Sequence, residues 1–552
     1  MRNAEIPSLR KSRGAFFTPT PMAEFLVRWA IRSSSDKVLE PSCGEASFLL
    51  AAGNHLRSLG ANQLFWSHQL HGVEIHKASA DAALALLSRS NLDANIEVRD
   101  FFACDPSSQY DAVVGNPPYV RYQKFAGRAR AKSLEAALTQ GVRLSGLASS
   151  WAAFVVHASR FLSPDGRLAL VLPAELLTVN YAAEVRRFLL RRFANVRLVM
   201  FEERVFPGVL EEVVLLLAEG AGGAKFFEVH QARNIKSLST IDAANWTEHR
   251  PINNEKWTPA LLPPDNHAQY RSLSASRGFS PLLNWGRTYL GAVTGNNRYF
   301  AISRTEAAKL RLPEDDLVRI SPPGSRHLRG LRFTRRAWDS LFLDEAPSLL
   351  FCPRKKLSAA ANRYISLGED RGVNKAYKCA VRSPWWQVPL VPVPDLFLTY
   401  MNHDRPRLIS NESRAHILNS IYGVTLHPEH RKIGRKCLPI ACMNSVTLLG
   451  AEVVGRAYGG GLLKIEPKEA DLLPVPSVSL LEAVAEKLSH LRPQLAVALR
   501  RNDLQRAVEM VDRIVLKEEL DVSDEVISGL RSARELLFQR RRTRGRANRG
   551  KD

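Results

Sequence analysis

The feature that most constrains the fold is a series of short apolar runs that each end on a polar residue. In the first 120 residues these runs end at Glu40, Glu74, Asp100 and Asn116. Stretches with helical spacing follow the first two runs, at residues 45–59 and 77–89. Alternating strands and helices predict a doubly wound, Rossmann-like α/β sheet, whose parallel strands end at one ligand-binding edge. We therefore expect the four polar side chains to face the same edge.

The last of these runs, residues 111–114, leads through Gly115 into the loop Asn116-Pro117-Pro118-Tyr119. Two consecutive prolines fix φ near −65° and remove two amide donors, so the loop is stiff and its carbonyls can accept hydrogen bonds from a ligand. The side-chain oxygen of Asn116 and the carbonyl of Pro117 suit the two hydrogens of an amino group. Tyr119 offers a ring on which a planar group can stack. The alternative is an ordinary turn, in which Asn and Pro are common.

The turn after the first strand, Pro41-Ser42-Cys43-Gly44, contains a single glycine. It lacks the G-x-G-x-x-G pattern of dinucleotide sites, so a pyrophosphate is not expected there. A small turn beside an acidic strand end suits a ligand that carries an amino group. Glu74 lies at the tip of the second strand, where doubly wound folds hold ribose hydroxyls.

Composition limits the class of protein and of partner. A chain of 552 residues is long enough for two or three domains, and its net charge of +22 indicates a polyanion such as DNA, RNA or an anionic membrane. The membrane is the weakest of these, because no long basic amphipathic helix and no spanning segment is found. Residues 1–13 lack a signal-peptide core, which favours an intracellular protein. The six cysteines form no C-x-x-C pair, so neither a disulfide framework nor a metal site is expected.

Five motifs resemble those of a known family. In chain order they are Phe16-Phe17-Thr18-Pro19, Leu39-Glu40-Pro41-Ser42-Cys43-Gly44, Gly72-Val73-Glu74, Asp100-Phe101 and Asn116-Pro117-Pro118-Tyr119. They are similar to motifs X, I, II, III and IV of S-adenosylmethionine-dependent amino methyltransferases. With motif X first and a long C-terminal extension, the order resembles the gamma-class DNA adenine-N6 methyltransferases of restriction-modification systems (TaqI-like). The resemblance covers about residues 14–220.

The resemblance implies a class I methyltransferase domain that binds S-adenosyl-L-methionine. The residues that it implies for the cofactor are Thr18, Glu40, Ser42, Gly44, Glu74, Asp100 and Phe101. The first three would line the methionine end, with Gly44 in the same turn. Glu74 would accept hydrogen bonds from the ribose hydroxyls, Asp100 would accept from the adenine amino group, and Phe101 would lie beside the adenine ring. The glycine pattern of motif I is reduced relative to many methyltransferases.

The resemblance also implies the reaction, which is methyl transfer to the exocyclic N6 of an adenine flipped out of duplex DNA. Asn116, Pro117 and Tyr119 would be the catalytic residues, and no metal is expected. Val205-Phe206-Pro207 resembles motif VIII, so Phe206 would be a second aromatic contact of the target base beside Tyr119. A buried core phenylalanine is the alternative interpretation of Phe206.

Beyond the catalytic domain (1–225) we expect a linker (226–280), an α+β target-recognition domain (281–478), C-terminal helices (479–539) and a basic tail (540–552). Within the recognition domain, basic and aromatic residues interleave in β-type runs at residues 291–300, 332–336 and 378–386. Such pairs suit phosphate contacts and base readout. The tail is expected to be a disordered arm that binds phosphates. The arginine run of residues 186–192 is expected to be a solvated face.

Several alternatives remain open at this level. An Asn-Pro-Pro-Tyr loop also occurs in enzymes that methylate protein glutamine or RNA guanine, and cytosine N4 is a further target. A fused nuclease would need an acidic P-D and D/E-x-K pattern, but Pro394-Asp395 lacks the follower and Glu314-Asp315-Asp316 lacks the lysine. An inactive DNA-binding relative is a third class. The favoured interpretation is a cytoplasmic, nucleoid-associated bacterial monomer that binds double-stranded DNA and protects it against a cognate restriction endonuclease.

Overall fold

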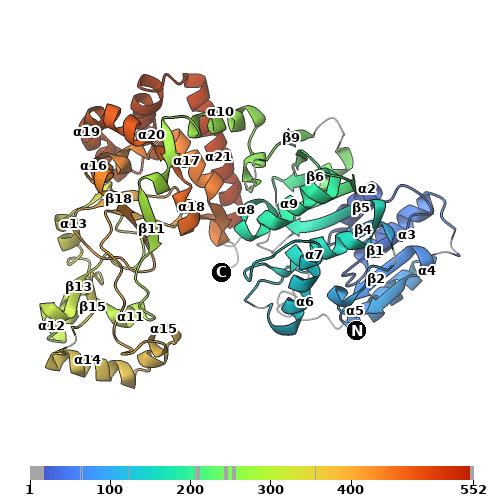
Figure 1. Cartoon of the computed structure of the whole chain (residues 1–552), viewed down its shortest axis with the longest axis horizontal. Coiled ribbons are helices and arrows are strands. Elements are labelled where there is room, and N and C mark those ends of the chain that lie inside the picture. Colours follow the sequence, from blue (N-terminus) through green and yellow to red (C-terminus); the bar gives the residue numbers. More distant parts are fainter. Residues whose placement is uncertain are drawn as a thin grey trace. The chain divides into compact units, whose positions relative to one another are not determined.

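The computed structural model describes residues 18–546, except residues 63, 65, 108, 124, 204, 207–211, 242–245, 252–255 and 355. The chain divides into two compact units, Met1–Leu261 and Leu262–Asp552 (Figure 1). Phe16 and Phe17 of the predicted motif X lie outside the described residues, as do residues 547–552 of the predicted tail.

The first unit is built on one large mixed sheet, formed by nine strands among the described residues. In sheet order the strands are β3 (Asn95–Val98), β2 (Leu70–Glu74), β1 (Val38–Glu40), β4 (Tyr110–Gly115), β5 (Leu162–Pro173), β7 (Val213–Ala221), β6 (Phe193–Phe201), β8 (Phe227–Ala232) and β9 (Thr247–His249). The strands from β3 to β5 are parallel, whereas β7 is antiparallel to both of its neighbours. The reversal of strand order at β1 and β4 gives the predicted doubly wound topology, with a switch point between them.

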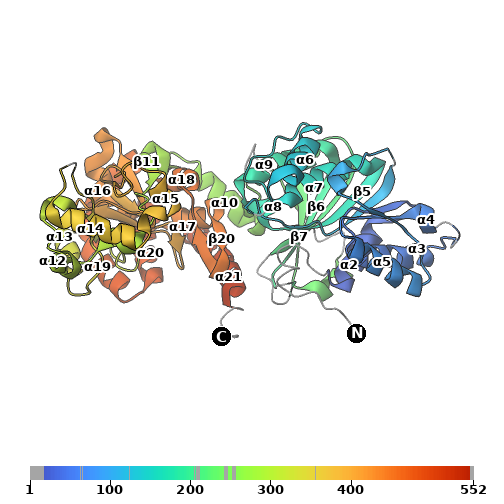
Figure 2. The same cartoon turned by 90° about the horizontal axis from the view of Figure 1, so that it is seen from below.

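Helices cover both faces of this sheet. The helices are α2 (Thr20–Ala30), α3 (Ser47–Ser58), α4 (Trp66–Gln69), α5 (Lys77–Arg89), α6 (Gly127–Leu138), α7 (Ser150–Ala158), α8 (Glu175–Thr178) and α9 (Ala183–Arg192). Figure 2 shows α2, α3 and α5 on one face and α6, α7 and α9 on the other. Parallel strands need such cover on both faces, which explains why β1 and residues 166–173 of β5 are continuous buried runs.

Two predictions for this unit need correction. Residues 227–232 and 247–249, predicted as part of a linker, form β8 and β9 at the edge of the sheet. Their mixed polarity reflects strands whose buried and half-buried residues are interspersed, not a connecting segment. In the arginine run of α9, Arg186 is 3% exposed, and its Nη1 donates to the carbonyls of Leu176 and Val179 at 2.8 and 3.2 Å. That arginine caps the end of α8 and does not belong to a solvated face.

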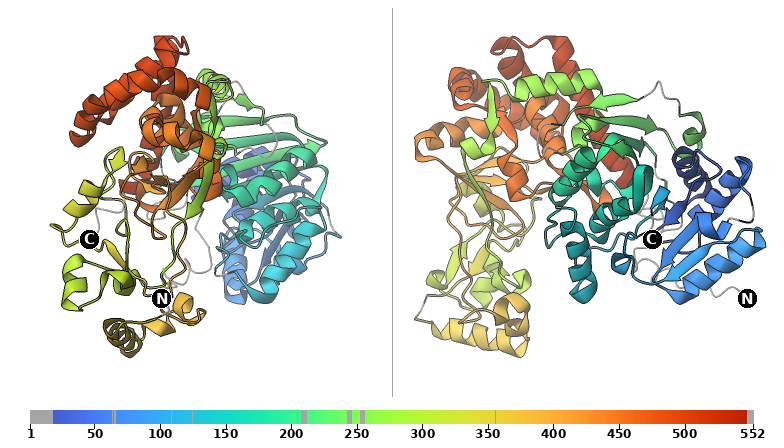
Figure 3. Two further views of the ribbon diagram at one scale, coloured as in Figure 1. Left: turned by 60° about the vertical axis from the view of Figure 1, so that its left-hand side comes forward. Right: turned by 45° about the vertical axis from the view of Figure 1, so that its right-hand side comes forward.

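The second unit combines small sheets with helices. Among the described residues its strands form four sheets. In strand order, two of these sheets are β10 (Phe279–Pro281) with β22 (Pro474–Pro476), and β11 (Gly286–Leu290), β19 (Tyr422–Leu426), β16 (Leu396–Leu398), β18 (Leu408–Asn411) and β14 (Arg332–Phe333). The other two are β12 (Ala301–Ile302), β15 (Leu349–Phe351) and β13 (Leu317–Arg319), and β17 (Met401–Asn402), β21 (Leu462–Lys464) and β20 (Arg456–Tyr458). The helices are α10 (Pro264–Ser274), α11 (Asn297–Phe300), α12 (Arg304–Lys309), α13 (Arg335–Ser340), α14 (Ala359–Asp370), α15 (Tyr377–Ala380), α16 (Arg431–Ala441), α17 (Ser445–Val454), α18 (Pro467–Asp471), α19 (Val478–Arg500), α20 (Leu504–Asp512) and α21 (Asp524–Arg546). Figure 3 shows the long helices gathered at one end of this unit, with α12, α14 and α15 at the other.

Three predictions for the second unit differ from the structure. The β-type runs at residues 291–300 and 378–386 contain the short helices α11 and α15 instead of strands. Residues 540–546, predicted as the start of a disordered tail, continue α21. Arg541 in that helix is 3% exposed and pairs with Glu452 at 2.7 Å, so tertiary contacts explain why the helix continues.

In the part of the chain that the structure describes, no single helix is long and apolar enough to cross a membrane. Two consecutive helical segments, Pro428–Ala441 and Ser445–Val454, are together long and apolar enough to span a membrane, but they are bent by 88° relative to each other.

Candidate active site

The carboxyl ends of β1, β2 and β4 bring three of the predicted residues together. Glu40 ends β1, Glu74 ends β2, and Asn116 follows the last residue of β4. Burial raises the pKa of Glu40, and the charge of the nearby Glu74 adds to the shift. A Cβ placed on Gly115 would lie 3.7 Å from the Cγ of Glu40, so the residue before Asn116 contacts the first glutamate. One site therefore contains all three side chains.

The turn between β1 and α3 adopts a left-handed backbone at two residues. Gly44 has φ +51° and Ala46 has φ +62°. Glycine adopts this conformation freely, whereas for Ala46 it costs about 1–2 kcal/mol. A Cβ on Gly44 would meet no atom within 4 Å, so the turn leaves open space for a ligand on this side. Ala46 was not predicted as a site residue, because its residue type carries no signal of a left-handed turn.

Glu40 is a buried carboxylate with an exposed fraction of 3%. The N–H of Leu49, in the first turn of α3, donates to its Oε2 at 3.0 Å. Burial raises the pKa of Glu40 well above its usual range, and the neighbouring Glu74 adds to that shift. No basic side chain of the described residues pairs with Glu40. A cationic group on a ligand would therefore stabilise its ionised form.

Glu74 holds the same turn with both of its oxygens. The N–H of Gly44 donates to Oε2 and the N–H of His76 donates to Oε1, each at 2.9 Å. The residue is 6% exposed. Because each carboxylate oxygen has two lone pairs, each can accept a further hydrogen bond from a ligand hydroxyl. The geometry is thus compatible with the predicted contact to a ribose.

Asp100 lies after β3, at the start of the short helix η2 (Phe101–Ala103). Its Oδ1 accepts from the N–H of Phe102 at 3.1 Å, and the Nζ of Lys132 lies 3.8 Å from its Oδ2. The side chain is 27% exposed, so one edge of the carboxylate faces solvent. Lys132 was not singled out from the sequence, since a lysine in an exposed helix usually has no site role.

Phe101 lies in the core of the unit, with an exposed fraction of 4%. Its ring centroid lies 4.9 Å from that of Phe154 and 4.7 Å from that of His157, both on α7. The Nε2 of His157 lies 3.0 Å from the carbonyl of Phe101, and burial lowers the pKa of His157 to about 4. A neutral His157 that donates from Nε2 therefore holds η2 in place. The half-buried neighbour Phe102 is the more accessible ring of this helix.

The Asn-Pro-Pro-Tyr loop is fixed by contacts at both ends. The Nδ2 of Asn116 donates to the Oγ1 of Thr18 at 3.2 Å, and Thr18 is 4% exposed. This bond turns the side-chain oxygen of Asn116 away from Thr18. Pro117 is buried. Tyr119 is 9% exposed, and its hydroxyl donates to the carbonyl of Val171 in β5 at 2.9 Å.

Ser150, the first residue of α7, closes a clamp on this loop. Its hydroxyl donates to the carbonyl of Pro118 and accepts from the N–H of Val120 at 2.9 Å. The N–H of Ser150 donates to the carbonyl of Val120 at 3.0 Å. Helix α7 thus holds the loop through its first residue and η2 through His157. Neither polar contact could be predicted from the mostly apolar sequence of this helix.

A polar cluster follows β5 on the same side of the sheet. Trp151, which is fully buried, donates from Nε1 to the hydroxyl of Tyr181 at 3.1 Å and to Oε2 of Glu175 at 3.3 Å. The hydroxyl of Tyr181 also donates to Glu175. Burial, followed by the charge of Glu175, raises the pKa of Tyr181 above its usual range. Tyr181 therefore stays protonated and acts as a hydrogen-bond donor.

Phe206 is 5% exposed and lies between β6 and β7. Its neighbours at positions 204 and 207–211 lie outside the described residues. Its predicted contact with a target base stays a prediction.

Two family models match this chain. Residues 4–222 match the model described as N-6 DNA Methylase, and residues 254–516 match the C-terminal domain of the Type II methyltransferase M.Eco57I. The two matches fall on the first and the second unit, respectively, apart from residues 254–261.

Curated relatives match over most of the chain. The Type II methyltransferase M.AccI of Acinetobacter calcoaceticus is 23% identical, covering 83% of this chain and 84% of the relative. The Type II methyltransferase M.XamI of Xanthomonas campestris pv. amaranthicola is 26% identical, covering 85% and 86%. Among solved structures, the Type IIL restriction-modification enzyme MmeI in complex with DNA has a TM-score of 0.55 at 12% identity, covering 97% of this chain and 80% of that one. That likeness supports the fold.

Proposed function

The chain belongs to the N6-adenine DNA methyltransferases of restriction-modification systems, and we propose that it transfers a methyl group from S-adenosyl-L-methionine to a flipped adenine in duplex DNA. The TaqI-like gamma class fits the order of its motifs. The observation that carries the proposal is the convergence of Glu40, Glu74 and Asn116 at one sheet edge.

The residues present suit this cofactor. Glu40 is a buried carboxylate without a basic partner among the described side chains, and a methionine amino group supplies the missing cation. Glu74 keeps lone pairs for two ribose hydroxyls, and the space beside Gly44 leaves room for the ligand. Thr18 and Ser42 complete the methionine end. Asp100 accepts from the adenine amino group.

When bound, the cofactor supplies a methyl group on a sulfonium, which is an electrophile. The amino group of adenine is a poor nucleophile because its lone pair is delocalised into the ring. The Oδ1 of Asn116 and the carbonyl oxygen of Pro117 each accept a hydrogen bond from this amino group. These two bonds favour a pyramidal nitrogen with an available lone pair. Positioning and electrostatic stabilisation then supply most of the rate. A rigid loop serves this purpose, and the hydrogen bonds that Asn116 and Val120 donate to Thr18 and Ser150 supply the rigidity.

The target base has to leave the duplex to reach the loop, which costs a few kcal/mol. Stacking on Tyr119 recovers roughly 1–3 kcal/mol. The bond between the Tyr119 hydroxyl and Val171 fixes the ring plane before the base arrives. Phe206 provides a second aromatic contact for the target base.

The test compares Asn116→Ala, Tyr119→Ala and Tyr119→Phe. Asn116→Ala should abolish transfer of a radiolabelled methyl group to DNA while cofactor binding, measured by calorimetry, stays unchanged. Tyr119→Ala should reduce transfer less, and Tyr119→Phe, which keeps the ring, less again. Full activity of Asn116→Ala would refute the assignment of the site. Parallel assays with RNA and protein, and sequencing that separates N6-methyladenine from N4-methylcytosine, would identify a different substrate.

We infer a biological role that fits the family. The enzyme protects host DNA in the bacterial cytoplasm against a cognate restriction endonuclease. Expression in a host without this system, followed by methylation-aware sequencing, would give the modified base and its sequence context. An endonuclease encoded beside this chain should fail to cut the DNA from that host.

A further inference from the structure

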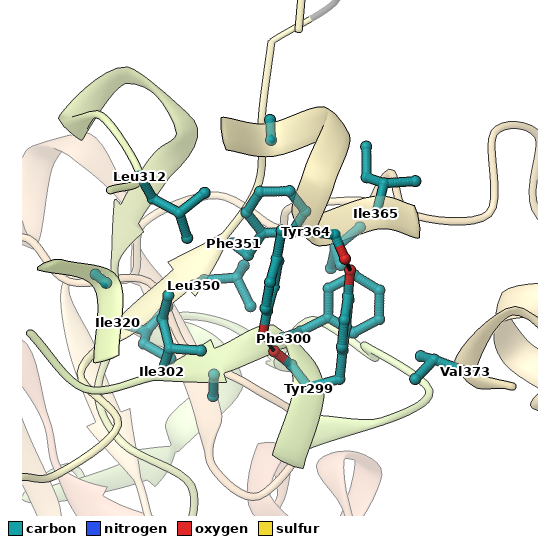
Figure 4. Packing of buried hydrophobic residues seen from close by; sticks show 14 of the residues in the cluster. Tyr299, Phe300, Ile302, Leu312, Ile320, Leu350, Phe351, Tyr364, Ile365 and Val373 are labelled. Atoms are coloured by element: carbon teal, nitrogen blue, oxygen red, sulfur yellow. Dashed lines mark hydrogen bonds between the residues drawn. The ribbon is translucent and has the colours of Figure 1, made fainter. Parts of the chain in front are cut away.

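The second unit carries a lobe with its own core, formed by residues 292–320 and 349–388. The chain enters it from β11 and leaves it toward β16, and both of these strands pair with β19. At its centre Tyr299 and Tyr364 stack with ring centroids 4.6 Å apart and planes inclined by 6° (Figure 4). Each hydroxyl donates to the backbone carbonyl of the other residue at 2.8 Å. We call this part the distal lobe; its core is closely packed and internally hydrogen-bonded.

The short helix α15 is attached firmly to the distal lobe. Cys379 is fully buried, and its Sγ lies 3.5 Å from the carbonyl of Thr294. The guanidinium of Arg382 donates to the same carbonyl. Gly295 has φ +89°, and a Cβ there would lie 2.9 Å from both the Sγ of Cys379 and the Nη2 of Arg382. The helix and this turn are therefore in direct contact, so α15 has a defined orientation.

The outer face of α15 is apolar and basic. Tyr377 is 75% exposed and Val381 is 65% exposed, and residues four apart lie on the same side of a helical turn. The Nζ of Lys378 lies 5.4 Å from the ring centroid of Tyr377. Residues 371–382 contain the cations Arg371, Lys375, Lys378 and Arg382 and no acidic residue, and the nearest acidic residues in the sequence are the exposed Glu369 and Asp370 before them. Exposed apolar side chains flanked by lysines suit a polyanion that also offers apolar surface.

The same unit offers a contrasting exposed apolar site after α13. Leu343 is 83% exposed and Phe342 is 48% exposed. Their immediate neighbours Asp344 and Glu345 are acidic and exposed. A polyanion would be repelled there, so exposure alone does not identify the DNA-contacting surface. Charge distinguishes α15 from this site.

We propose that α15 is a base-contacting tip of the second unit, which reads DNA. This proposal rests on the proposed function. Tyr377 and Val381 enter a groove of the duplex and make apolar contacts with bases, such as the methyl group of thymine or an unstacked base step. Lys375 and Lys378 bind the flanking phosphates. The buried contacts of Cys379 and Arg382 hold the tip in position, which reduces the entropy lost on binding.

The experiment first identifies the methylated sequence of the wild-type enzyme by methylation-aware sequencing. Fluorescence anisotropy then measures binding to a duplex with that sequence and to a scrambled duplex over a range of salt concentrations. Tyr377→Ser and Val381→Ser should each weaken binding to the specific duplex by about 10- to 100-fold and leave binding to the scrambled duplex within about twofold. Lys375→Gln and Lys378→Gln should weaken both, each lowering the salt slope by about 0.9.

Matched controls are Leu343→Ser, which removes an exposed apolar side chain beside acidic residues, and Lys309→Gln, which removes an exposed lysine on α12. Both should bind the specific duplex as wild type does, and all variants should keep wild-type cofactor binding. Wild-type affinity of Tyr377→Ser and Val381→Ser would overturn the proposal, as would equal losses on both duplexes. If the wild-type enzyme transfers no methyl group to DNA, the proposed function itself fails, whatever the variants bind.

Discussion

Two buried glutamates, one in each unit, are accommodated in opposite ways. Glu452 on α17 is 7% exposed and forms a bidentate pair with Arg541 on α21, with distances of 2.7 and 3.1 Å. Glu40 is 3% exposed, accepts from the N–H of Leu49, and has no basic partner among the described side chains. A buried charge is costly unless it is paired. The difference indicates that Glu452 stabilises the folded structure, whereas Glu40 binds a cationic group of a ligand.

The paired glutamate belongs to a set of contacts that α21 makes. Besides its pair with Glu452, Arg541 donates to the carbonyls of His403 and Gly461 at 3.0 and 2.6 Å. Arg531, on the same helix, pairs with the buried Asp512 at 2.8 Å. These donors satisfy groups on several elements of the second unit. Arg541, which was predicted as part of a phosphate-binding tail, therefore stabilises tertiary structure instead.

The largest effect should come from breaking the paired glutamate. Arg541→Ala leaves Glu452 buried without its cation and should lower the free energy of unfolding by about 3–5 kcal/mol. Chemical denaturation followed by circular dichroism measures it. The double variant Arg541→Met with Glu452→Leu, which removes both charges, should be nearer to wild type. A loss below about 1 kcal/mol for Arg541→Ala would mean that this pair does not differ from a surface contact.

The next effect should come from the unpaired glutamate. Glu40→Gln keeps an acceptor for the N–H of Leu49 and removes the negative charge. Cofactor affinity, measured by calorimetry, should fall about 10- to 100-fold, the usual value of a hydrogen bond to a charged group. The unfolding temperature of the free protein should rise, because the buried charge is gone. A variant that binds the cofactor as wild type does would show that Glu40 is structural.

Glu40 also predicts a pH dependence. Its pKa in the folded protein lies above the unfolded value because of burial. As pH rises from the unfolded pKa to the folded pKa, the unfolded chain ionises first, so the contribution of Glu40 to stability falls. Cofactor affinity should rise through the folded pKa, because a cationic amino group prefers ionised Glu40. Glu40→Gln should remove the pH dependence of both stability and cofactor affinity. The prediction would be contradicted if the cofactor affinities of wild type and variant changed with pH in parallel.

A smaller effect, on the rate of methyl transfer, is expected at Ser150. The prediction tests whether Ser150 positions the Asn-Pro-Pro-Tyr loop or is only the first residue of α7. Ser150→Ala removes the hydroxyl that joins Pro118 to Val120 and should lower kcat about tenfold, since misplaced reacting groups slow transfer. The KM for the cofactor should not change. Ser150→Thr, which keeps the hydroxyl, should restore most of the rate. Equal rates for all three proteins would remove any positioning role.

The sequence predicted the first unit well for a physical reason. Parallel strands buried on both faces are continuous apolar runs, and their polar ends are visible as single residues, as at Glu74 and Asn116. Helix 77–89 was predicted with its observed bounds, and the strand before it ends at Glu74 as predicted. The site residues that were missed, Ala46, Ser150 and His157, act through backbone conformation or distant contacts. Neither property changes the local residue pattern.

The second unit was harder to predict because long-range contacts decide its local structure. Helix α15 covers four residues within a basic and aromatic stretch, too few for any helical period to show. Its position depends on Thr294, which is far away in the sequence. The same holds for Arg541, whose partner Glu452 lies 89 residues earlier. Residue patterns report periodicity and burial, whereas contacts of this kind follow only from the assembled fold.

The smallest effect separates the two kinds of C-terminal arginine. Deletion of residues 547–552 removes Arg549 and Lys551 but leaves Arg541 in place. Because each phosphate contact contributes about 0.9 to the salt slope, the slope for DNA binding should fall by at most about 2, and the free energy of unfolding should not change. Deletion of residues 540–552 also removes Arg541 and should destabilise the protein as Arg541→Ala does. If the shorter deletion destabilises the protein as much as the longer one, residues 547–552 stabilise the fold and their cations do not only bind phosphates.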